Sequence, residues 1–150
     1  MSPYELGRDG PSAILVAVDG SPTSLRAAAF AVGHARRQGG RLVCLFVRRA
    51  APPVGALSPL AGPHASLALR EHEDDVEREL REGLTLVPSH VEAVLEVRRG
   101  DPYHEITVVA DQYRADLVVV GASQSLGHKI AGSLAARLIR AGRWPVTVVP

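Results

Sequence analysis

Five short apolar runs, separated by longer stretches of mixed polarity, set the pattern of this 150-residue chain. The runs are continuous rather than alternating, as expected of strands that are covered on both faces of a sheet. They span residues 13–18, 42–47, 91–97, 117–120 and 145–149. Helical spacing of apolar residues fills the gaps between them. The resulting order β-α-β-α-β-α-β-α-β predicts an α/β fold, a parallel sheet with helices on both faces.

Local signals bound the predicted helices. Ser21-Pro22 begins the first helix, because serine caps free amides and proline fits the first helical position, and Gly39-Gly40 ends it. Asp101-Pro102 begins the third helix and Gly132-Ser133 the last. The predicted buried faces of the four helices carry Leu25, Ala28, Ala29 and Val32; Leu69, Val76, Leu80 and Leu84; Ile106, Val109, Ala110 and Tyr113; and Ile130, Leu134 and Leu138.

Two stretches fall outside this pattern of strands and helices. Residues 1–12 are polar and contain glycine and proline, so we expect a flexible lead before a single domain over residues 13–150. Residues 48–65 hold four prolines and predict a long loop. The second helix follows, and its acidic residues, interleaved with arginines, predict a solvated face with intrahelical ion pairs.

Composition places the chain among globular proteins, because 46% of its residues are hydrophobic and 22% are charged. A net charge of +1 gives no reason to expect a nucleic-acid or membrane partner. The first residues lack the apolar core of a signal peptide and no apolar run is long enough to span a bilayer, so we expect a cytoplasmic protein. The single cysteine, Cys44, lies in an apolar run and is expected to be buried.

The stretch after the fourth apolar run predicts chemistry. Gly121 follows the strand directly, and Gly132-Ser133 opens the last helix. Glycine lets the backbone approach a ligand closely, and the amides at a helix start attract phosphate. This loop therefore predicts a nucleotide site with hydroxyl groups from Ser123, Ser125 and Ser133, although the same residues also fit ordinary turns and caps. Neither a Walker-type lysine motif nor G-x-G-x-x-G is present.

Other candidate groups are fewer. Asp19 ends the first strand, where a carboxylate can accept a hydrogen bond from ribose, bind magnesium or simply form a turn. His128 and Lys129 are candidates to meet a phosphate charge, or are exposed loop residues. Residues 121–125 resemble a strained nucleophile turn, but serine stands at the fifth position where glycine is needed, which disfavours a serine hydrolase. The six histidines lack paired metal-ligand spacing, so we predict no resident metal site.

The last apolar run, residues 145–149, raises the question of assembly. An uncovered apolar edge strand invites pairing. Pairing with the same strand of a second copy makes a closed two-fold dimer. The alternative is an edge that is short and blunted by Pro145 and Pro150. We expect the homodimer.

Taken together, these residues resemble the universal stress protein family over residues 14–149. The resemblance rests on ILVAVDGS at 14–21, GDP at 100–102, ADLVVVG at 115–121, Gly132-Ser133 and PVTVV at 145–149. It implies a Rossmann-like, adenine nucleotide alpha hydrolase-like fold: a five-stranded parallel sheet in the order 3-2-1-4-5 with four helices. It also implies a dimer through the last strand, and either an ATP-binding branch or a branch that does not bind ATP.

The ATP-binding branch carries the loop G-x2-G-x9-G-[S/T]. The first glycine corresponds to Gly121 and the final pair to Gly132-Ser133, but the middle glycine falls on Gln124. Only seven residues then separate Gln124 from Gly132, two fewer than in the pattern. Gly127 and the serines of the loop offer a rearranged but permissive alternative.

The other positions of the resemblance match more closely. It implies that Asp19 meets ribose, that Ala17 and Val47 lie against adenine, and that Ser133 and the amide of Leu134 meet phosphate. The predicted nucleotide site comprises Ala17, Asp19, Val47, Gly121, Ser123, Gly127, Gly132, Ser133 and Leu134.

The predicted function is that of a regulatory protein that binds an adenine nucleotide, ATP first, with or without Mg²⁺. Two alternatives stay open. One is a dimeric interaction module of the same fold that has lost its nucleotide, which the altered loop motivates. The other is a slow ATPase that uses Asp19 and magnesium; no general base is apparent, so no catalytic residue is assigned.

Overall fold

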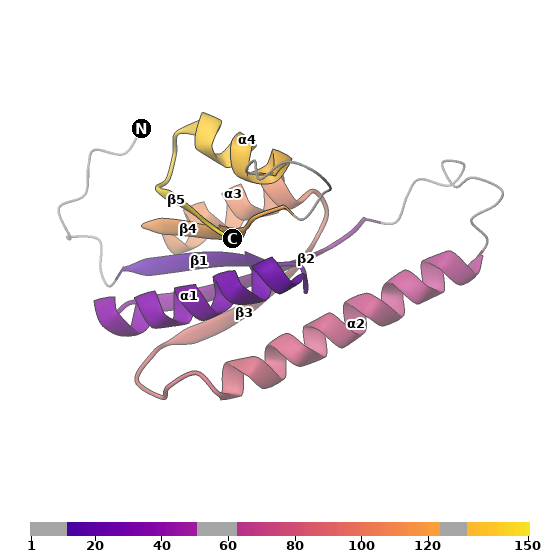
Figure 1. Cartoon of the computed structure of the whole chain (residues 1–150), viewed down its shortest axis with the longest axis horizontal. Helices are drawn as coiled ribbons and strands as arrows, with labels where there is room; N and C mark the ends of the chain where they lie inside the picture. Colours follow the sequence, from indigo (N-terminus) through magenta and orange to yellow (C-terminus); the bar gives the residue numbers. More distant parts are fainter. Residues whose placement is uncertain (1–11, 51–62, 124–131) are drawn as a thin grey trace.

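The computed structural model describes residues 12–50, 63–123 and 132–150. Within them, five strands form one parallel sheet in the order β3-β2-β1-β4-β5, and four helices cover it (Figure 1). The elements are β1 (Ala13–Val18), α1 (Pro22–Gln38), β2 (Arg41–Arg48), α2 (Pro63–Thr85), β3 (Ala93–Arg99), α3 (Pro102–Tyr113), β4 (Leu117–Gly121), α4 (Ser133–Ala141) and β5 (Val146–Val149). The predicted α/β fold and strand order are confirmed. Residues 1–11 of the predicted lead lie outside the described residues.

Both faces of the sheet are buried. Helices α1 and α2 cover one face, and α3 and α4 cover the other (Figure 1). Successive residues of β1 point to opposite faces, so Val16 joins the core under α1 while Leu15 joins the core under α3 and α4. Two covered faces explain the continuous apolar runs. Cys44 is buried as predicted, and this burial raises the pKa of its thiol to about 12.

The third strand begins later than the apolar run suggests. Val91, the first residue of that run, precedes β3 and donates its N–H to the carbonyl of Pro88 at 2.8 Å, closing a turn. Its side chain is nevertheless buried against the core. Apolarity therefore marks burial at Val91 and not strand pairing, and β3 instead continues to Arg99.

Helix α1 has the predicted ends but not the predicted buried face. Ser21 is its N-cap, with Oγ accepting the N–H of Ser24 at 3.3 Å, and Gly39 ends it in the left-handed conformation. Leu25 is 43% exposed and Ala29 is exposed, so their placement on the buried face is wrong. The buried positions are all small residues: Thr23, Ser24, Ala27, Ala31 and Ala35. Small side chains let α1 approach the sheet closely, and this close approach selects the face.

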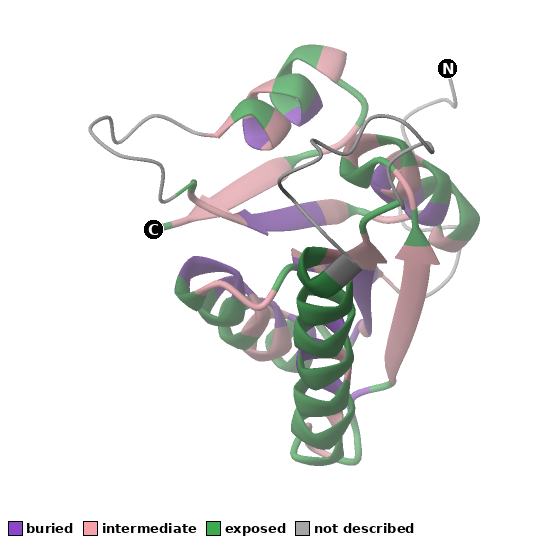
Figure 2. Ribbon diagram, turned by 90° about the vertical axis from the view of Figure 1, so that its right-hand side faces the viewer, coloured by how far each residue is buried: buried purple, intermediate pink, exposed green. Residues whose placement is uncertain are grey.

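Helix α2 begins at Pro63, inside the stretch predicted as a loop, of which residues 51–62 lie outside the described residues. Leu69, predicted to be buried, is 38% exposed. The reason is position: the first turns of α2 extend past the sheet (Figure 1), and the helix is exposed over most of its surface (Figure 2). Val76 and Leu80, further along, are buried as predicted, and Leu84 is partly buried.

The acidic side of α2 is not wholly solvated, contrary to prediction. Glu73 is buried and accepts the backbone N–H of Arg49 at 2.8 Å. The guanidinium of Arg48 donates to Asp74 at 2.7 Å and to Glu77 at 2.6 Å. These contacts fasten α2 to the end of β2. The predicted intrahelical pairing does occur on the exposed side, where Arg81 also donates to Glu77.

Candidate functional site

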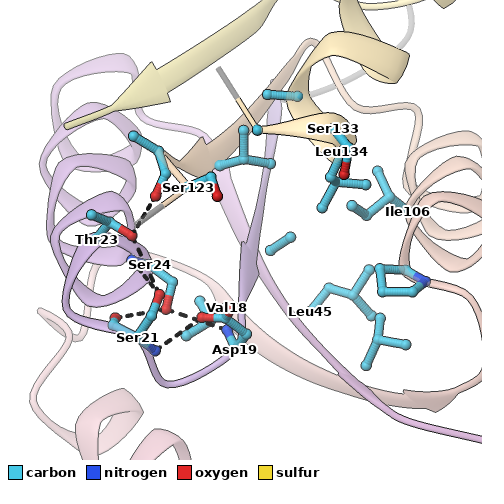
Figure 3. Close-up of a pocket in the computed structure, with 18 residues that line it drawn as sticks. Val18, Asp19, Ser21, Thr23, Ser24, Leu45, Ile106, Ser123, Ser133 and Leu134 are labelled. Atoms are coloured by element: carbon cyan, nitrogen blue, oxygen red, sulfur yellow. Dashed lines mark hydrogen bonds between the residues drawn. The ribbon is translucent and has the colours of Figure 1, made fainter. Parts of the chain in front are cut away.

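The carboxyl ends of the strands meet at one edge of the sheet, where the strand order reverses. From β1 the chain leads to β2 on one side, whereas β4 pairs with β1 on the other. Parallel α/β folds bind their ligands beyond this point. A cleft of about 370 Å³ opens there, lined by residues that follow or end β1, β2 and β4 and by the first turns of α1, α3 and α4 (Figure 3).

The cleft brings together eight of the nine predicted site residues: Ala17, Asp19, Val47, Gly121, Ser123, Gly132, Ser133 and Leu134. The ninth, Gly127, lies outside the described residues, as do Gln124, Ser125, His128 and Lys129. Segments more than 100 residues apart in the chain thus line one cavity, as the strand order requires.

Several lining residues were missing from the prediction. Thr23 and Ser24 come from the first turn of α1, Leu45 from β2, and Pro102 and Ile106 from α3. A sequence signal existed for Thr23, Ser24 and Pro102, because each lies within a turn of a predicted helix start that follows a strand. Ile106 lies further along its helix and was predicted only as a buried position. Leu45 carried no such signal, since it belongs to an apolar run in which alternate residues face opposite sides of the sheet.

Asp19 follows β1 in an ordered turn. One carboxylate oxygen accepts the N–H of Ser21 at 2.9 Å, and the Asp19 N–H donates to the hydroxyl of Ser24 at 3.3 Å. Partial burial raises the pKa of Asp19, but hydrogen bonds from Ser21 and Ser24 together outweigh that effect and hold the pKa below its ordinary value. The side chain is therefore ionised at neutral pH, and its oxygens can only accept hydrogen bonds.

A wall of hydroxyl groups borders Asp19. Figure 3 shows Ser21, Thr23 and Ser24 gathered on one side of the cleft, all from the start of α1. The hydroxyl of Ser24 donates to the carbonyl of Ser21 at 2.9 Å, and the Ser21 and Thr23 hydroxyls lie 3.3 Å apart. The buried Thr23 hydroxyl donates to the carbonyl of Ala122 at 2.8 Å. This network ties the start of α1 to the segment after β4.

Gly121 is required at the end of β4 for steric reasons. A Cβ atom at this position would lie 2.6 Å from the carbonyl carbon of Thr23 and 2.7 Å from the amide nitrogen of Ser24. Real Cβ atoms do not approach backbone so closely. Glycine therefore lets β4 and the first turn of α1 meet at the base of the cleft.

Helix α4 begins at the cleft with Gly132 as its N-cap, which provides no side-chain cap for the first amides. Ser133 is thus the first helical residue and not the cap. A Cβ at Gly132 would lie 2.6 Å from that of Ser123, so the two ends of the segment between β4 and α4 are in close contact. Amides at a helix start carry partial positive charge and favour anions.

The opposite side of the cleft is apolar. Leu45, Ile106 and Leu134 lie across from the hydroxyl groups of α1 (Figure 3). Ala17 and Val47 also line the cleft and belong to the same apolar cluster as these three residues. The cleft therefore offers an apolar surface, a carboxylate with neighbouring hydroxyls, and a helix start. These features suit a ligand with a flat apolar part, hydroxyl groups and an anionic group. Among the described residues, no three His, Cys, Asp or Glu side chains are grouped to hold a metal ion.

Comparison with known proteins identifies the family. The universal stress protein family matches residues 12–150. This chain belongs to that family. A universal stress protein of Methanocaldococcus jannaschii is 28% identical over 138 residues, which are 91% of this chain and 80% of the relative. The structure of the universal stress protein UspA from Lactobacillus plantarum is 27% identical, with a TM-score of 0.76 over 93% of this chain and 97% of that one.

Two more distant universal stress proteins share the fold and have been solved with adenine nucleotides. One, from Archaeoglobus fulgidus, is in complex with dAMP; it is 20% identical, with a TM-score of 0.62 over 93% of this chain and 98% of that one. The other is in complex with cAMP; it is 22% identical, with a TM-score of 0.59 over 93% and 97%. Both therefore share the doubly wound architecture in which the cleft lies.

One further region of this universal stress protein bears on assembly. Strand β5 is at the edge of the sheet and pairs only with β4 among the described strands. All four of its residues are partly exposed. A strand with a free edge is available for pairing.

In the described part of the chain, no helix is both long and apolar enough to cross a membrane.

Proposed function

We propose that this protein binds an adenine nucleotide, ATP first, as a regulatory ligand in the cleft between β1 and β4. One observation carries the proposal: an ionised carboxylate and the start of a helix without a side-chain cap share a single cleft of about 370 Å³. That volume lies within the range of small-molecule sites. The dAMP and cAMP complexes of two members of the family support adenine as the base.

The proposed placement follows the chemistry of the walls. Adenine packs against the apolar surface that includes Ala17 and Val47, where a flat aromatic ring loses little hydration. A ribose hydroxyl donates a hydrogen bond to Asp19. The proposed acceptor is the carboxylate oxygen that does not already accept the N–H of Ser21. Phosphate lies at Ser133 and the amide of Leu134, at the start of α4.

The loop between β4 and α4 supplies the remaining proposed contacts. Gly121, Ser123 and Gly132 border the cleft, and Gly127 is proposed to take the part of the glycine that Gln124 replaces. In this proposal a magnesium ion binds only together with the phosphates of the nucleotide. Asp19 offers one carboxylate, and Mg²⁺ is commonly held by one or two carboxylates together with substrate phosphates.

Regulation follows from the position of the site. A ligand that contacts the segments after β1 and β4 together stabilises the arrangement in which they meet, and shifts the population towards it. We propose that this change alters the surface offered to partners in the cytoplasm. We also propose a homodimer through residues 145–149, because no described strand other than β4 pairs with β5.

A second candidate is a dimeric interaction module that binds no nucleotide. Gln124 at the position of the middle glycine and the loop shortened by two residues favour it. A Cβ there restricts close approach of the backbone to a phosphate. The geometry of the described cleft favours the nucleotide-binding form.

Calorimetric titration of the purified protein with ATP separates these candidates. Saturable heat supports the nucleotide site, whereas no heat at millimolar ATP would overturn it and favour the interaction module. Gly132→Val is expected to abolish binding, because its side chain would displace Ser123 at the mouth of the cleft. Gly83→Val is the matched control, since a Cβ at Gly83 meets no atom within 4 Å. Equal affinity in both variants would place the site elsewhere.

A separate assay addresses turnover. Phosphate release from ATP that disappears in Asp19→Ala would favour a slow ATPase over a purely regulatory role. Binding without release, with affinity reduced in Asp19→Ala, is the result that the regulatory proposal expects.

A further inference from the structure

Arg137 lies on α4 one helical turn after Ser133. Residues four apart share one side of a helix, and side chains lean towards the helix start. Arg137 is thus directed back towards the turn that borders the cleft. Its side chain is 53% exposed, so it is free to change conformation without disturbing the core.

The contacts of Arg137 place its guanidinium between α3 and α4. The guanidinium carbon lies 4.1 Å from the centre of the Tyr103 ring, and Nη1 lies 3.9 Å from Oδ1 of Asp101. Asp101 and Tyr103 flank Pro102, which lines the cleft, and Leu134 lines it from the α4 side. Arg137 itself is not among the residues that line the cleft, but its charge contacts both neighbours of Pro102 and comes three residues after Leu134 on α4.

Neither contact is strong enough to hold the guanidinium in place: the ion pair with Asp101 is long, and a cation–π contact such as that with Tyr103 contributes little at an exposed site. A separation of 3.9 Å exceeds hydrogen-bond distance, and both charged groups are more than half exposed, so solvent screens the pair. The other oxygen of Asp101 already accepts the N–H of His104 at 2.9 Å as the cap of α3. The arginine side chain can rotate away from these weak contacts towards a phosphate group. With phosphate a guanidinium forms two parallel charge-assisted hydrogen bonds.

We propose that Arg137 is a specificity-determining residue that turns from Tyr103 and Asp101 to the phosphate chain of the bound nucleotide. This inference rests on the proposed nucleotide function and deepens it. The amides at the start of α4 bind the first phosphate, and Arg137 binds the phosphates beyond it. The site then prefers nucleoside polyphosphates to nucleoside monophosphates and to adenosine.

Calorimetric affinities for adenosine, AMP and ATP test this assignment in the full-length protein. Arg137→Gln is expected to weaken ATP binding by about tenfold or more and to leave adenosine binding unchanged. Arg137→Lys keeps the charge but loses the planar fork, so an intermediate loss for ATP is expected. Arg140→Gln is the matched control: it removes the same charge from the exposed surface of the same helix, three residues further from the cleft.

The outcomes separate this inference from the function on which it rests. If the wild-type protein binds ATP and Arg137→Gln binds it equally well, only the role of Arg137 is overturned. An equal loss for adenosine and ATP would mean that Arg137 merely supports the fold of the site, and also overturns the role. If the wild-type protein binds neither ligand, the proposed function falls and the inference falls with it.

Discussion

The hydroxyl of Thr23 donates a 2.8 Å hydrogen bond to the carbonyl of Ala122, joining positions 99 residues apart in the chain. Thr23 belongs to the first turn of α1, and Ala122 follows β4 directly. Both residues line the cleft. This bond joins the first turn of α1, which follows Asp19, to the residue after β4, and we expect it to couple the proposed ribose contact at Asp19 to the proposed contacts of Gly121 and Ser123.

Thr23→Val is expected to loosen this coupling. Valine keeps the shape of threonine but leaves the Ala122 carbonyl without its partner, and the loss should lower the free energy of unfolding by about 1–3 kcal/mol. ATP affinity should fall as well. Denaturant unfolding and calorimetry measure the two effects. Thr23→Ser retains the hydroxyl and is expected to restore most of the affinity; failure to do so would show that packing, and not the hydrogen bond, matters.

Gly121→Ala tests the close approach of β4 to α1. The added methyl group would press on the backbone of Thr23, which cannot move without shifting the start of α1. A cost of roughly 1–3 kcal/mol in the free energy of unfolding is expected, as for other overpacked sites. Gly83→Ala provides the contrast: it lies inside α2 with open space around it and should stabilise the protein by about 0.5–1 kcal/mol. Similar effects from both substitutions would argue against a steric role for Gly121.

The fold could be predicted from the sequence because strands buried on both faces of a sheet have continuous apolar sequences. Continuous apolar runs identified every strand, and Ser21, Asp101 and Gly39 marked three of the helix ends. Strand order, however, came from the family resemblance, since no local signal says which strand pairs with β1. That order is what brings Asp19 and Gly121 into one cleft.

What could not be predicted depends on distances between elements. Leu25 fits a buried helical position by spacing, yet α1 turns its small residues to the sheet because the sheet is near. In the sequence Glu73 is one of many acidic residues on the second helix, but in the fold it accepts the amide N–H of Arg49 at the end of β2. Thr23 is an ordinary first-turn residue in sequence, and its role depends on a partner 99 residues away. Tertiary contact decides each case.

The contact between β2 and α2 should make stability depend on pH. Hydrogen bonds from Arg81 and Arg48 lower the pKa of Glu77 below its ordinary value. A carboxyl group whose pKa is lower in the folded state stabilises the fold at pH values above the unfolded pKa, and this stabilisation is lost as the pH falls through the folded pKa. Glu77 therefore contributes fully at pH 7 and loses its contribution below about pH 4.

Glu77→Gln tests this dependence by thermal unfolding at several pH values. The variant is expected to be less stable than the wild type at pH 7, by about 1–3 kcal/mol, because Arg48 and Arg81 lose a charged partner. The difference should shrink as the pH falls below about 4. Glu79→Gln, on the exposed side of the same helix, should show neither effect. A deficit that persists at low pH would point to packing instead of charge.

The proposed dimer makes a prediction that depends on which way the amides of β5 point. The carbonyl of Pro145 accepts the N–H of Val118 in β4 at 3.0 Å, and the carbonyl of Val149 accepts the N–H of Ala122, directly after β4, at 2.7 Å. In a parallel strand the N–H and C=O of one residue point to the same side, and the side alternates along the chain. Thr147 therefore faces β4, whereas the N–H of Val148 faces the open edge.

Val148→Pro removes an edge N–H without removing a bond to β4, and proline is tolerated on edge strands in this orientation. Sedimentation should show monomers with a melting temperature near that of the wild-type protein. Thr147→Pro is the matched control, because it removes an N–H that faces β4 and should lower the melting temperature. A dimer that persists in folded Val148→Pro would mean that the two copies associate through another surface, since the edge of β5 could no longer pair across its full length.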